Sequence, residues 1–97
     1  MPASARVTNF DHMMYRRATD VIVTDLAREL VLLDPRNGEM FALNTTARRI
    51  WLSLPADVPR LAALIVVEFN VSVDHAYDDA AALLGQMEQA GLITRAE

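Results

Sequence analysis

The side chains that could do acid–base or metal chemistry are few in this sequence, and they stand apart from one another. His12 and His75 are its two histidines, and neither has a second ligand at the spacing of a metal site, so a surface or capping role is favoured for each. Asp78 and Asp79 are neighbours, and on a helix they would point about 100° apart, so they would not share a proton as paired carboxylates do. They suit the positive end of a helix dipole instead.

The sequence also lacks the residues needed for nucleophilic catalysis, redox chemistry and phosphate binding. The chain has no Cys, which excludes disulfides, zinc ribbons, iron–sulfur clusters and thiol catalysis. Its glycines, Gly38, Gly85 and Gly91, are too far apart for a phosphate-binding loop, and no Ser or Thr stands in a nucleophile motif. The sequence therefore predicts a protein that is not an enzyme and that holds no metal and no cofactor.

Size and hydropathy indicate one small domain without a membrane span. The chain has 97 residues and is 53% hydrophobic. Its longest apolar run, 61–67, has seven residues, whereas a bilayer span needs about 20. Residues 1–10 contain no apolar signal-peptide core, so we expect a cytoplasmic protein with no membrane partner.

The net charge of −4 is concentrated in the C-terminal third. All nine basic residues are arginines, and residues 1–60 carry eight of them together with seven acids. Residues 61–94 carry no basic residue and five acids, which are Glu68, Asp74, Asp78, Asp79 and Glu88. Such acids can be solvated helix faces or can meet a partner, and in either case they repel phosphates. Because phosphate contacts dominate nucleic-acid affinity, we expect no nucleic-acid partner.

Short strand and helix signals follow one another along the chain. Three strands separated by tight turns are predicted over 21–24, 29–33 and 39–43. Three helices are predicted over 46–54, 59–69 and 74–90, with Asn44 or Thr45 as the first cap and Gly91 as the last stop. The order predicts an α+β domain of winged-helix type, in which a three-stranded antiparallel meander is followed by three helices.

The N-terminal residues and the second face of the predicted sheet lie outside this arrangement of strands and helices. Residues 1–18 are expected to form an N-terminal arm, partly disordered or packed on the sheet, ahead of a domain over 19–94. The first two strands do not alternate apolar and polar residues, which is typical of strands covered on both faces. The helices would cover one face, and the arm, a second copy or a partner would cover the other.

The third helix has a broad apolar stripe and two flanks. On a helical wheel the stripe is made of Ala76, Ala80, Leu83, Leu84, Met87 and Gly91. One flank carries Tyr77, Ala81 and Glu88, and the other carries Asp79 and Gln86. Tyr77 and Ala81 could line a shallow groove, or Tyr77 could be an ordinary boundary residue with its hydroxyl in water.

Three classes of function remain open on these residues. A DNA-binding winged helix is disfavoured, because its third helix would carry acids and no base, although Arg48 and Arg49 lie on the first helix. A structural homodimer or enzyme subunit would use the apolar sheet face. A peptide-binding module would let an extended peptide add a strand at the open edge of 39–43, beside a groove along the third helix.

The ordered set of these features resembles the PqqD family. The resemblance rests first on the run Glu29-Leu-Val-Leu-Leu-Asp-Pro-Arg-Asn-Gly-Glu-Met-Phe-Ala-Leu-Asn-Thr-Thr-Ala-Arg-Arg-Ile-Trp51, with its apolar strand, Gly turn, Leu-Asn strand end and Ile-Trp. It continues in Phe69-Asn-Val71, Asp79-Ala-Ala-Ala-Leu-Leu84, Met87 and Gly91-Leu-Ile93, and covers about residues 16–94.

Members of this family are leader-peptide recognition elements for ribosomally made, post-translationally modified peptides. The resemblance implies a non-catalytic chaperone that presents a precursor's leader to a modifying enzyme, or to a leader peptidase or cyclase, in lasso-peptide-like or quinone-cofactor biosynthesis. It also implies that the leader pairs as an added strand with Glu39, Met40, Phe41, Ala42 and Leu43. On the third helix, the side chains chosen from the wheel are Tyr77, Ala81, Leu84 and Glu88.

Two loops depart from the family pattern. Ala27-Arg28 stands in the first hairpin, where the family often has Gly, and Pro55-Ala-Asp57 stands where it often has Asp-Gly. The second departure resembles lasso-type members more than quinone-synthesis members. A homodimer through the sheet face is the alternative to this reading.

Overall fold

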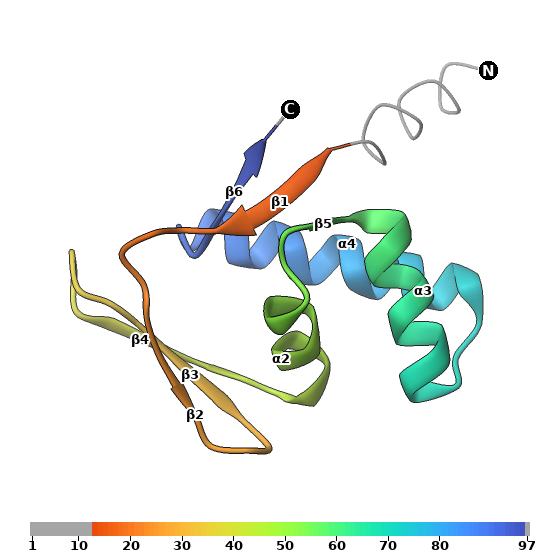
Figure 1. Cartoon of the computed structure of the whole chain (residues 1–97), viewed down its shortest axis with the longest axis horizontal. Coiled ribbons are helices and arrows are strands. Elements are labelled where there is room, and N and C mark those ends of the chain that lie inside the picture. Colours follow the sequence, from red (N-terminus) through yellow and green to blue (C-terminus); the bar gives the residue numbers. More distant parts are fainter. Residues whose placement is uncertain (1–12, 97) are drawn as a thin grey trace.

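The computed structural model describes residues 13–96, so His12 and most of the predicted N-terminal arm lie outside the described residues. Figure 1 shows a small sheet, a group of helices and a strand pair near the two ends of the chain. The elements in chain order are β1 (Met14–Arg17), β2 (Ile22–Asp25), β3 (Leu30–Asp34), β4 (Glu39–Leu43), α2 (Thr45–Leu52), β5 (Ala56–Asp57), α3 (Val58–Phe69), α4 (Val73–Gln89) and β6 (Ile93–Ala96). The predicted α+β fold class is confirmed.

Strands β2, β3 and β4 form the predicted antiparallel meander, with β3 in the middle. Leu32 of β3 lies opposite Val23 in β2 and Phe41 in β4. Leu32 is fully buried beneath the helices, whereas Ile22 and Met40 on the opposite face are 52% and 67% exposed. The outer face of this sheet is therefore apolar and largely open in the part of the chain that the structure describes.

A second sheet, which the sequence did not predict, has the order β5-β1-β6. Its middle strand β1 belongs to the expected N-terminal arm, and it pairs with β6 along its whole length and with β5 at Met14 and Tyr15. Tyr15 is only 2% exposed and joins the core. The described part of the arm thus lies in a sheet of its own, beside the C-terminal strand, and does not lie over the outer face of the meander.

The helices begin and end at residues that satisfy the free backbone groups of their termini. The Asn44 side chain accepts from Ala47 N–H at the start of α2, and the Ser72 hydroxyl accepts from His75 N–H at the start of α4. Gly91, with φ at 77°, follows the end of α4 as predicted. None of the described helices is long and apolar enough to cross a membrane.

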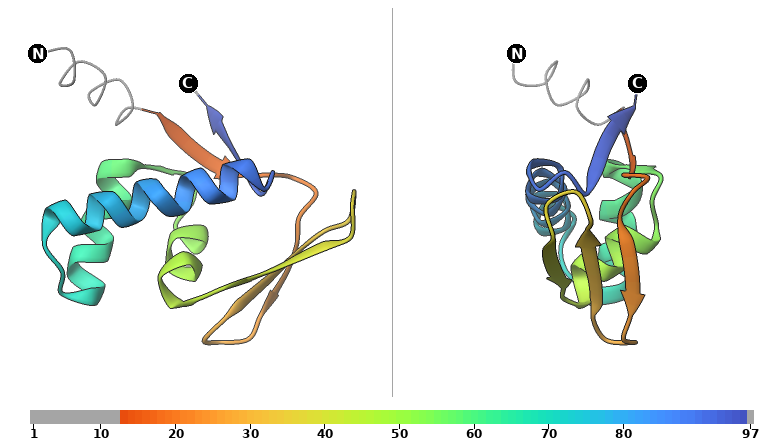
Figure 2. Two further views of the ribbon diagram at one scale, coloured as in Figure 1. Left: turned by 180° about the vertical axis from the view of Figure 1, so that it is seen from behind. Right: turned by 90° about the vertical axis from the view of Figure 1, so that its left-hand side faces the viewer.

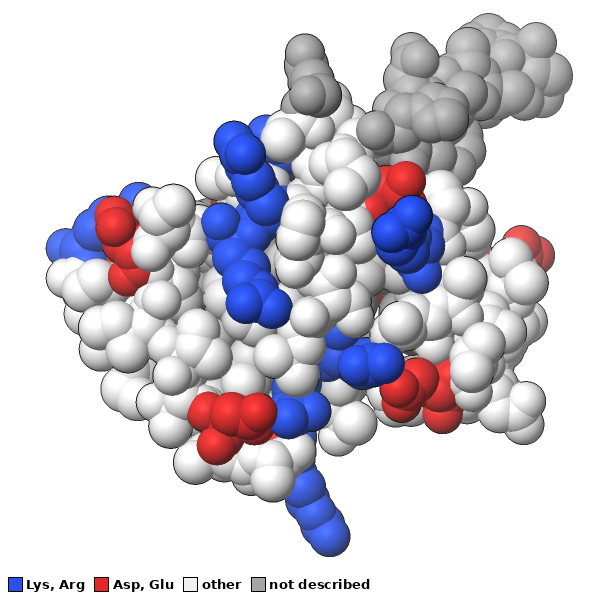
Figure 3. Space-filling model, in the orientation of Figure 1, with Lys and Arg blue, Asp and Glu red and all other residues white. Residues whose placement is uncertain are grey.

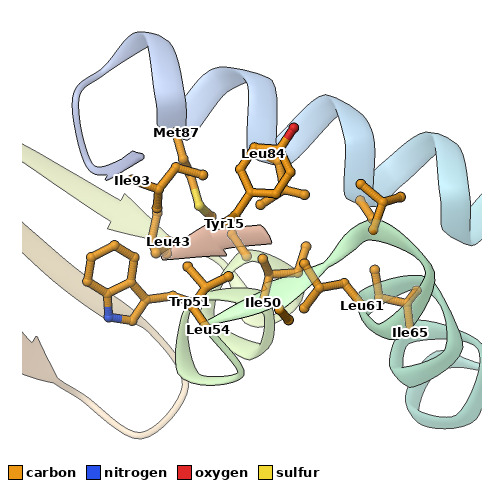
Figure 4. Close-up of a cluster of buried hydrophobic side chains, with 14 of the residues drawn as sticks. Tyr15, Leu43, Ile50, Trp51, Leu54, Leu61, Ile65, Leu84, Met87 and Ile93 are labelled. Atoms are coloured by element: carbon orange, nitrogen blue, oxygen red, sulfur yellow. The ribbon is translucent and has the colours of Figure 1, made fainter. Parts of the chain in front are cut away.

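The core lies between α4, the two shorter helices and the inner face of the meander (Figures 2 and 4). Trp51 is its largest fully buried side chain. The Arg17 guanidinium lies 5.5 Å from the centre of the Trp51 ring, and Arg17 Nε donates to the Trp51 carbonyl at 3.1 Å. This contact fixes strand β1 against helix α2.

An arginine ties the turn between β3 and β4 to the end of α4. Arg36 donates to both carboxylate oxygens of Asp34, at 2.9 and 3.0 Å, and its Nη2 also donates to the Gly91 carbonyl at 3.3 Å. Asp34 is the one charged side chain among the buried residues described, and these hydrogen bonds hold its pKa below the usual range. The hairpin is therefore fixed in position relative to the C-terminal end of the helix.

The hairpin between β2 and β3 contains a strained residue. Arg28 N–H donates to the Leu26 carbonyl at 2.8 Å, which closes a γ-turn centred on Ala27, whose φ is 72°. An L-residue avoids this region because its Cβ is crowded there, and the Asp25 carboxylate holds Ala27 in place by accepting its N–H at 2.9 Å. A glycine at this position would adopt the same backbone conformation without strain.

We predict that Ala27→Gly stabilises the protein. Relief of the left-handed strain, about 1–2 kcal/mol, exceeds the added flexibility of the unfolded chain, so the free energy of unfolding should rise by about 0.5–1 kcal/mol. The midpoint of thermal unfolding followed by circular dichroism should rise by roughly 2–6 °C. Ala82→Gly, at an exposed helical position with ordinary geometry, is the control and should lower the midpoint. An unchanged or lower midpoint for Ala27→Gly would contradict the strain.

We also predict an acid-dependent loss of stability that depends on Asp34. Because the pKa of Asp34 is lower in the folded chain than in the unfolded chain, the unfolded state takes up the proton first. The stabilising effect of the Asp34 carboxylate is complete above the ordinary aspartate pKa of about 3.9. It is lost as the pH falls through the lower pKa that Asp34 has in the folded chain. Melting curves between pH 6 and pH 2.5 should fall more steeply for the wild type than for Asp34→Asn. Asp78→Asn, which changes an exposed carboxylate, should keep the wild-type slope.

Candidate functional site

Strand β4 is an edge of the meander, with one side paired to β3 and the other open among the described residues. In the turn, Gly38 N–H donates to the Asp34 carbonyl at 2.8 Å, so Asp34 and its partner Glu39 face each other as a hydrogen-bonded pair. Backbone direction alternates along an antiparallel ladder. Met40 and Ala42 therefore direct their N–H and C=O groups toward the open edge.

The other edge of the sheet confirms this alternation. Leu26 N–H donates to the Glu29 carbonyl at 2.9 Å, which makes these two residues a hydrogen-bonded pair across the first hairpin. Counting along the ladder, Leu32 then directs its backbone groups away from β2 and toward β4, as the turn at Gly38 also requires. On β2 the residues that face the open side are Val23 and Asp25.

A groove of about 490 Å³ runs between β4 and the C-terminal half of α4. The strand side is lined by Met40, Phe41, Ala42, Leu43 and Asn44, the floor by Ala47 and Leu92, and the helix side by Leu83, Gln86, Met87 and Ala90. Nearly all of these side chains are apolar, and two are methionines, which adapt their shape to a ligand. The groove thus offers an apolar channel directly beside the free backbone groups of β4.

The structure brings the predicted strand residues to this groove but leaves the predicted helix residues away from its lining. Met40, Phe41, Ala42 and Leu43 line it, and Glu39 precedes them at the start of β4. The four residues chosen on α4 have other places. Leu84 is fully buried in the core, and Glu88 forms an ion pair with Arg95 at 2.6 Å. Tyr77 and Ala81 are half-buried on the same flank as Glu88.

The helix wall of the groove is the opposite flank of α4. The wheel placed Gln86 on that flank, and Leu83, Met87 and Ala90 lie next to it at helical spacing. Sequence periodicity defines both flanks of the helix equally well. It does not determine which of them faces the sheet. The buried stripe of α4, which includes Ala80, Leu84 and Met87, sets the rotation of the helix against the core. The hydrogen bond from Arg36 to the Gly91 carbonyl ties the end of the helix to the hairpin.

One acid stands on the groove flank of α4. Asp79 lies one turn before Leu83 on the helix, and its carboxylate is 3.1 Å from His75 Nε2. Glu88 belongs to the other flank, where Arg95 balances its charge. The negative charge next to the groove therefore comes from Asp79, and the described residues contain no group of three or more His, Asp or Glu side chains that could hold a metal ion.

Comparisons with known proteins agree with this architecture. Residues 29–93 match the family model described as PqqD, coenzyme PQQ synthesis protein D. A solved structure described as lasso peptide synthetase B1 complexed with the leader peptide is 29% identical, with a TM-score of 0.75, and the alignment covers 82% of this chain and 96% of that one.

A second solved structure has the same fold. It is described as TbiB1 in complex with the TbiA(beta) leader peptide, and it is 22% identical with a TM-score of 0.76 over 80% of this chain and 93% of that one. No curated protein matches significantly. Since the family model covers two thirds of the sequence, including β3, β4 and the three helices described within residues 13–96, the chain belongs to the PqqD family.

Proposed function

We propose that this protein is a non-catalytic chaperone that binds the leader of a ribosomally made precursor peptide and presents it to modifying or leader-cleaving enzymes. The observation that carries the proposal is the open edge of β4 directly beside an apolar groove. The similarity to a lasso peptide synthetase B1 that is complexed with a leader peptide supports it and favours a lasso-type pathway. Precursors made on ribosomes are met in the cytoplasm, where we expect the protein to act.

The leader would bind by strand addition. Met40 and Ala42 each offer one N–H and one C=O to an extended peptide, and each backbone hydrogen bond contributes about 0.5–1.5 kcal/mol net. Alternate side chains of the added strand would enter the groove against Leu83 and Met87, at about 25 cal/mol per Å² of apolar area buried. Together these terms are of the size needed for micromolar to nanomolar affinity.

Binding of this kind requires no catalytic group. The ionic side chains near the groove are engaged with one another, as in the Asp34–Arg36 and Asp79–His75 pairs. The leader-binding residues we propose are Met40, Phe41, Ala42, Leu43, Leu83, Gln86, Met87 and Ala90, which replace Tyr77, Ala81, Leu84 and Glu88 on the helix side.

The alternative is a structural homodimer or enzyme subunit that uses the outer face of the meander. Exposed Ile22 and Met40 on that face favour it. Light scattering separates the two functions, because a monomer that binds leader peptide excludes an obligate dimer. A DNA-binding role would place the acids of α4 against phosphates, and it fails if no operator fragment shifts at physiological salt.

We predict that Ala42→Pro weakens leader binding at least tenfold without unfolding the protein. Proline removes the N–H that faces the open edge, and an edge strand tolerates it because no bond to β3 is lost. The measurement is fluorescence anisotropy with the labelled synthetic leader of the precursor encoded beside this gene, together with a thermal melt.

Val23→Pro is the matched control for that experiment. It removes an outward N–H from β2, the opposite edge of the same sheet, which lies away from the groove. Strand addition at β4 predicts wild-type affinity for a folded Val23→Pro protein. Equal affinity of folded Ala42→Pro and wild type would refute strand addition at this edge.

We predict a salt-dependent role for Asp79 when the leader carries Lys or Arg near the start of α4. Asp79→Asn should weaken binding about 2–5-fold at 20 mM salt, because an exposed charge pair contributes up to about 1 kcal/mol, and the effect should vanish near 1 M salt. Asp78→Asn removes the same charge on a different side of the helix and should have less effect. If both variants lost the same affinity at every salt concentration, the prediction that Asp79 contributes electrostatically would be wrong.

A further inference from the structure

Helix α3 is apolar on two faces, and the core uses only one of them. Its inner face contributes Val58, Leu61, Ala62 and Ile65, all of which are buried. The outer residues Ala63 and Val67 are exposed, and Leu64 is half-buried. Val67 is 83% exposed, the largest value among the exposed large hydrophobic residues described. A helix that is apolar all round is normally covered on both sides.

These outer residues line a hollow between α2 and α3 of about 350 Å³. Ala63, Leu64 and Val67 make its apolar part, and Arg49, Arg60 and Glu68 stand around it. Arg49 and Glu68 form an ion pair at 2.8 Å across the two helices. The Arg60 side chain forms no ion pair among the described residues, although the Asp57 carboxylate accepts the Arg60 backbone N–H at 3.0 Å. The hollow therefore combines an aliphatic surface with one guanidinium group that has no ion-pair partner.

The surroundings of the hollow add further positive charge. Strand β1 pairs with β5, which leads directly into α3, and β1 carries Arg16 and Arg17. Arg17 bonds only to backbone carbonyls, and neither arginine forms an ion pair among residues 13–96. In Figure 3, basic side chains are spread over the face on which β1, α2 and α3 lie, with acidic side chains beside some of them. Because Arg16, Arg17 and Arg60 have no ion-pair partner among the described residues, a ligand of this face should be acidic as well as apolar.

The hollow and the leader groove share no lining residue. The groove lies between β4 and the C-terminal half of α4, whereas the hollow is formed by the outer sides of α2 and α3. The left view in Figure 2 shows α3 and β4 at separate parts of the molecule. A leader in the groove would leave the outer face of α3 accessible.

We propose that the outer face of α3, with Arg49 and Arg60, docks the enzyme that acts on the bound precursor. The docked segment would place an aliphatic side chain against Leu64 and Val67 and a carboxylate at Arg60. This proposal rests on the proposed function for the identity of the partner, since a leader chaperone must hold the peptide and contact the enzyme at the same time. An apolar centre with a charged rim is the usual build of such interfaces.

The charges of this face argue against a second copy as its occupant. A twofold contact through α3 would be self-complementary, and the one acid that lines the hollow is Glu68. Arg49 already engages Glu68 at 2.8 Å, so a second copy would bring no free carboxylate to Arg60. A stable interface buries about 800 Å² per partner, which is more than a few outer residues of α3 supply. An enzyme contact through α3 would need to extend over β1 and α2 as well.

The test measures leader binding and enzyme binding separately. Val67→Glu and Arg60→Glu change exposed positions, so both variants should fold and bind the labelled synthetic leader with wild-type affinity. Binding to the purified leader peptidase or cyclase encoded beside the precursor gene, measured by calorimetry without leader, should weaken at least tenfold. Val73→Glu is the matched control, because Val73 is also an exposed valine but lies at the start of α4.

Each result supports or overturns the proposal. Loss of enzyme binding in Val67→Glu and Arg60→Glu, with Val73→Glu like wild type, supports it. Wild-type enzyme binding by Val67→Glu overturns it, as does the absence of enzyme binding by the wild type. A wild-type dimer in light scattering that Val67→Glu dissociates assigns the face to a second copy. Binding to phosphatidylglycerol vesicles that Val67→Glu abolishes assigns it to a membrane. Failure of leader binding in the wild type refutes the proposed function and leaves the enzyme measurement to decide the docking face.

Discussion

The open backbone edge of β4 is the constraint around which this small protein is arranged. The outward N–H and C=O groups of Met40 and Ala42 must bond to water or to another strand, and natural sheets usually protect such an edge with charges, proline or a covering element. Here most residues of the edge strand are apolar, and the strand lies beside an apolar groove. A fold that leaves such an edge unprotected next to a groove is well suited to receive an extended peptide.

A groove of this kind is useful only if its two walls keep a fixed distance. Strand β4 and helix α4 are far apart in the sequence, and Arg36 connects them by bonding to Asp34 in the hairpin and to Gly91 after the helix. The carboxylate of Asp34 is buried, so its partner cannot be replaced by water without a cost. The same residues that form the turn therefore also set the width of the groove.

The sequence predicted what local signals determine. The turn 34–38, the Asn44 cap and Gly91 specify the meander and the helices from residues a few positions apart. Strand β1 was missed because its partner β6 lies at the other end of the chain, and pairing over that separation leaves no local pattern. A helical wheel could not identify which flank of α4 lines the groove, for a related reason. Periodicity gives the faces of a helix, and its tertiary packing decides which flank lies beside β4.

Recognition through an added strand has a consequence for specificity. Backbone hydrogen bonds accept almost any sequence, so in the proposed strand addition Met40 and Ala42 would supply affinity but little discrimination between peptides. Discrimination would then come from the few side chains that shape the groove, such as Leu83 and Gln86, and from the charge of Asp79 at its end. A surface elsewhere on the molecule, such as the apolar side of α3, would add a second and independent selection step at the level of the enzyme. At each step, discrimination is the ratio of the affinities for the right and the wrong partner. When two steps follow one another these ratios multiply, so two modest ratios give a stronger discrimination than the groove would give alone.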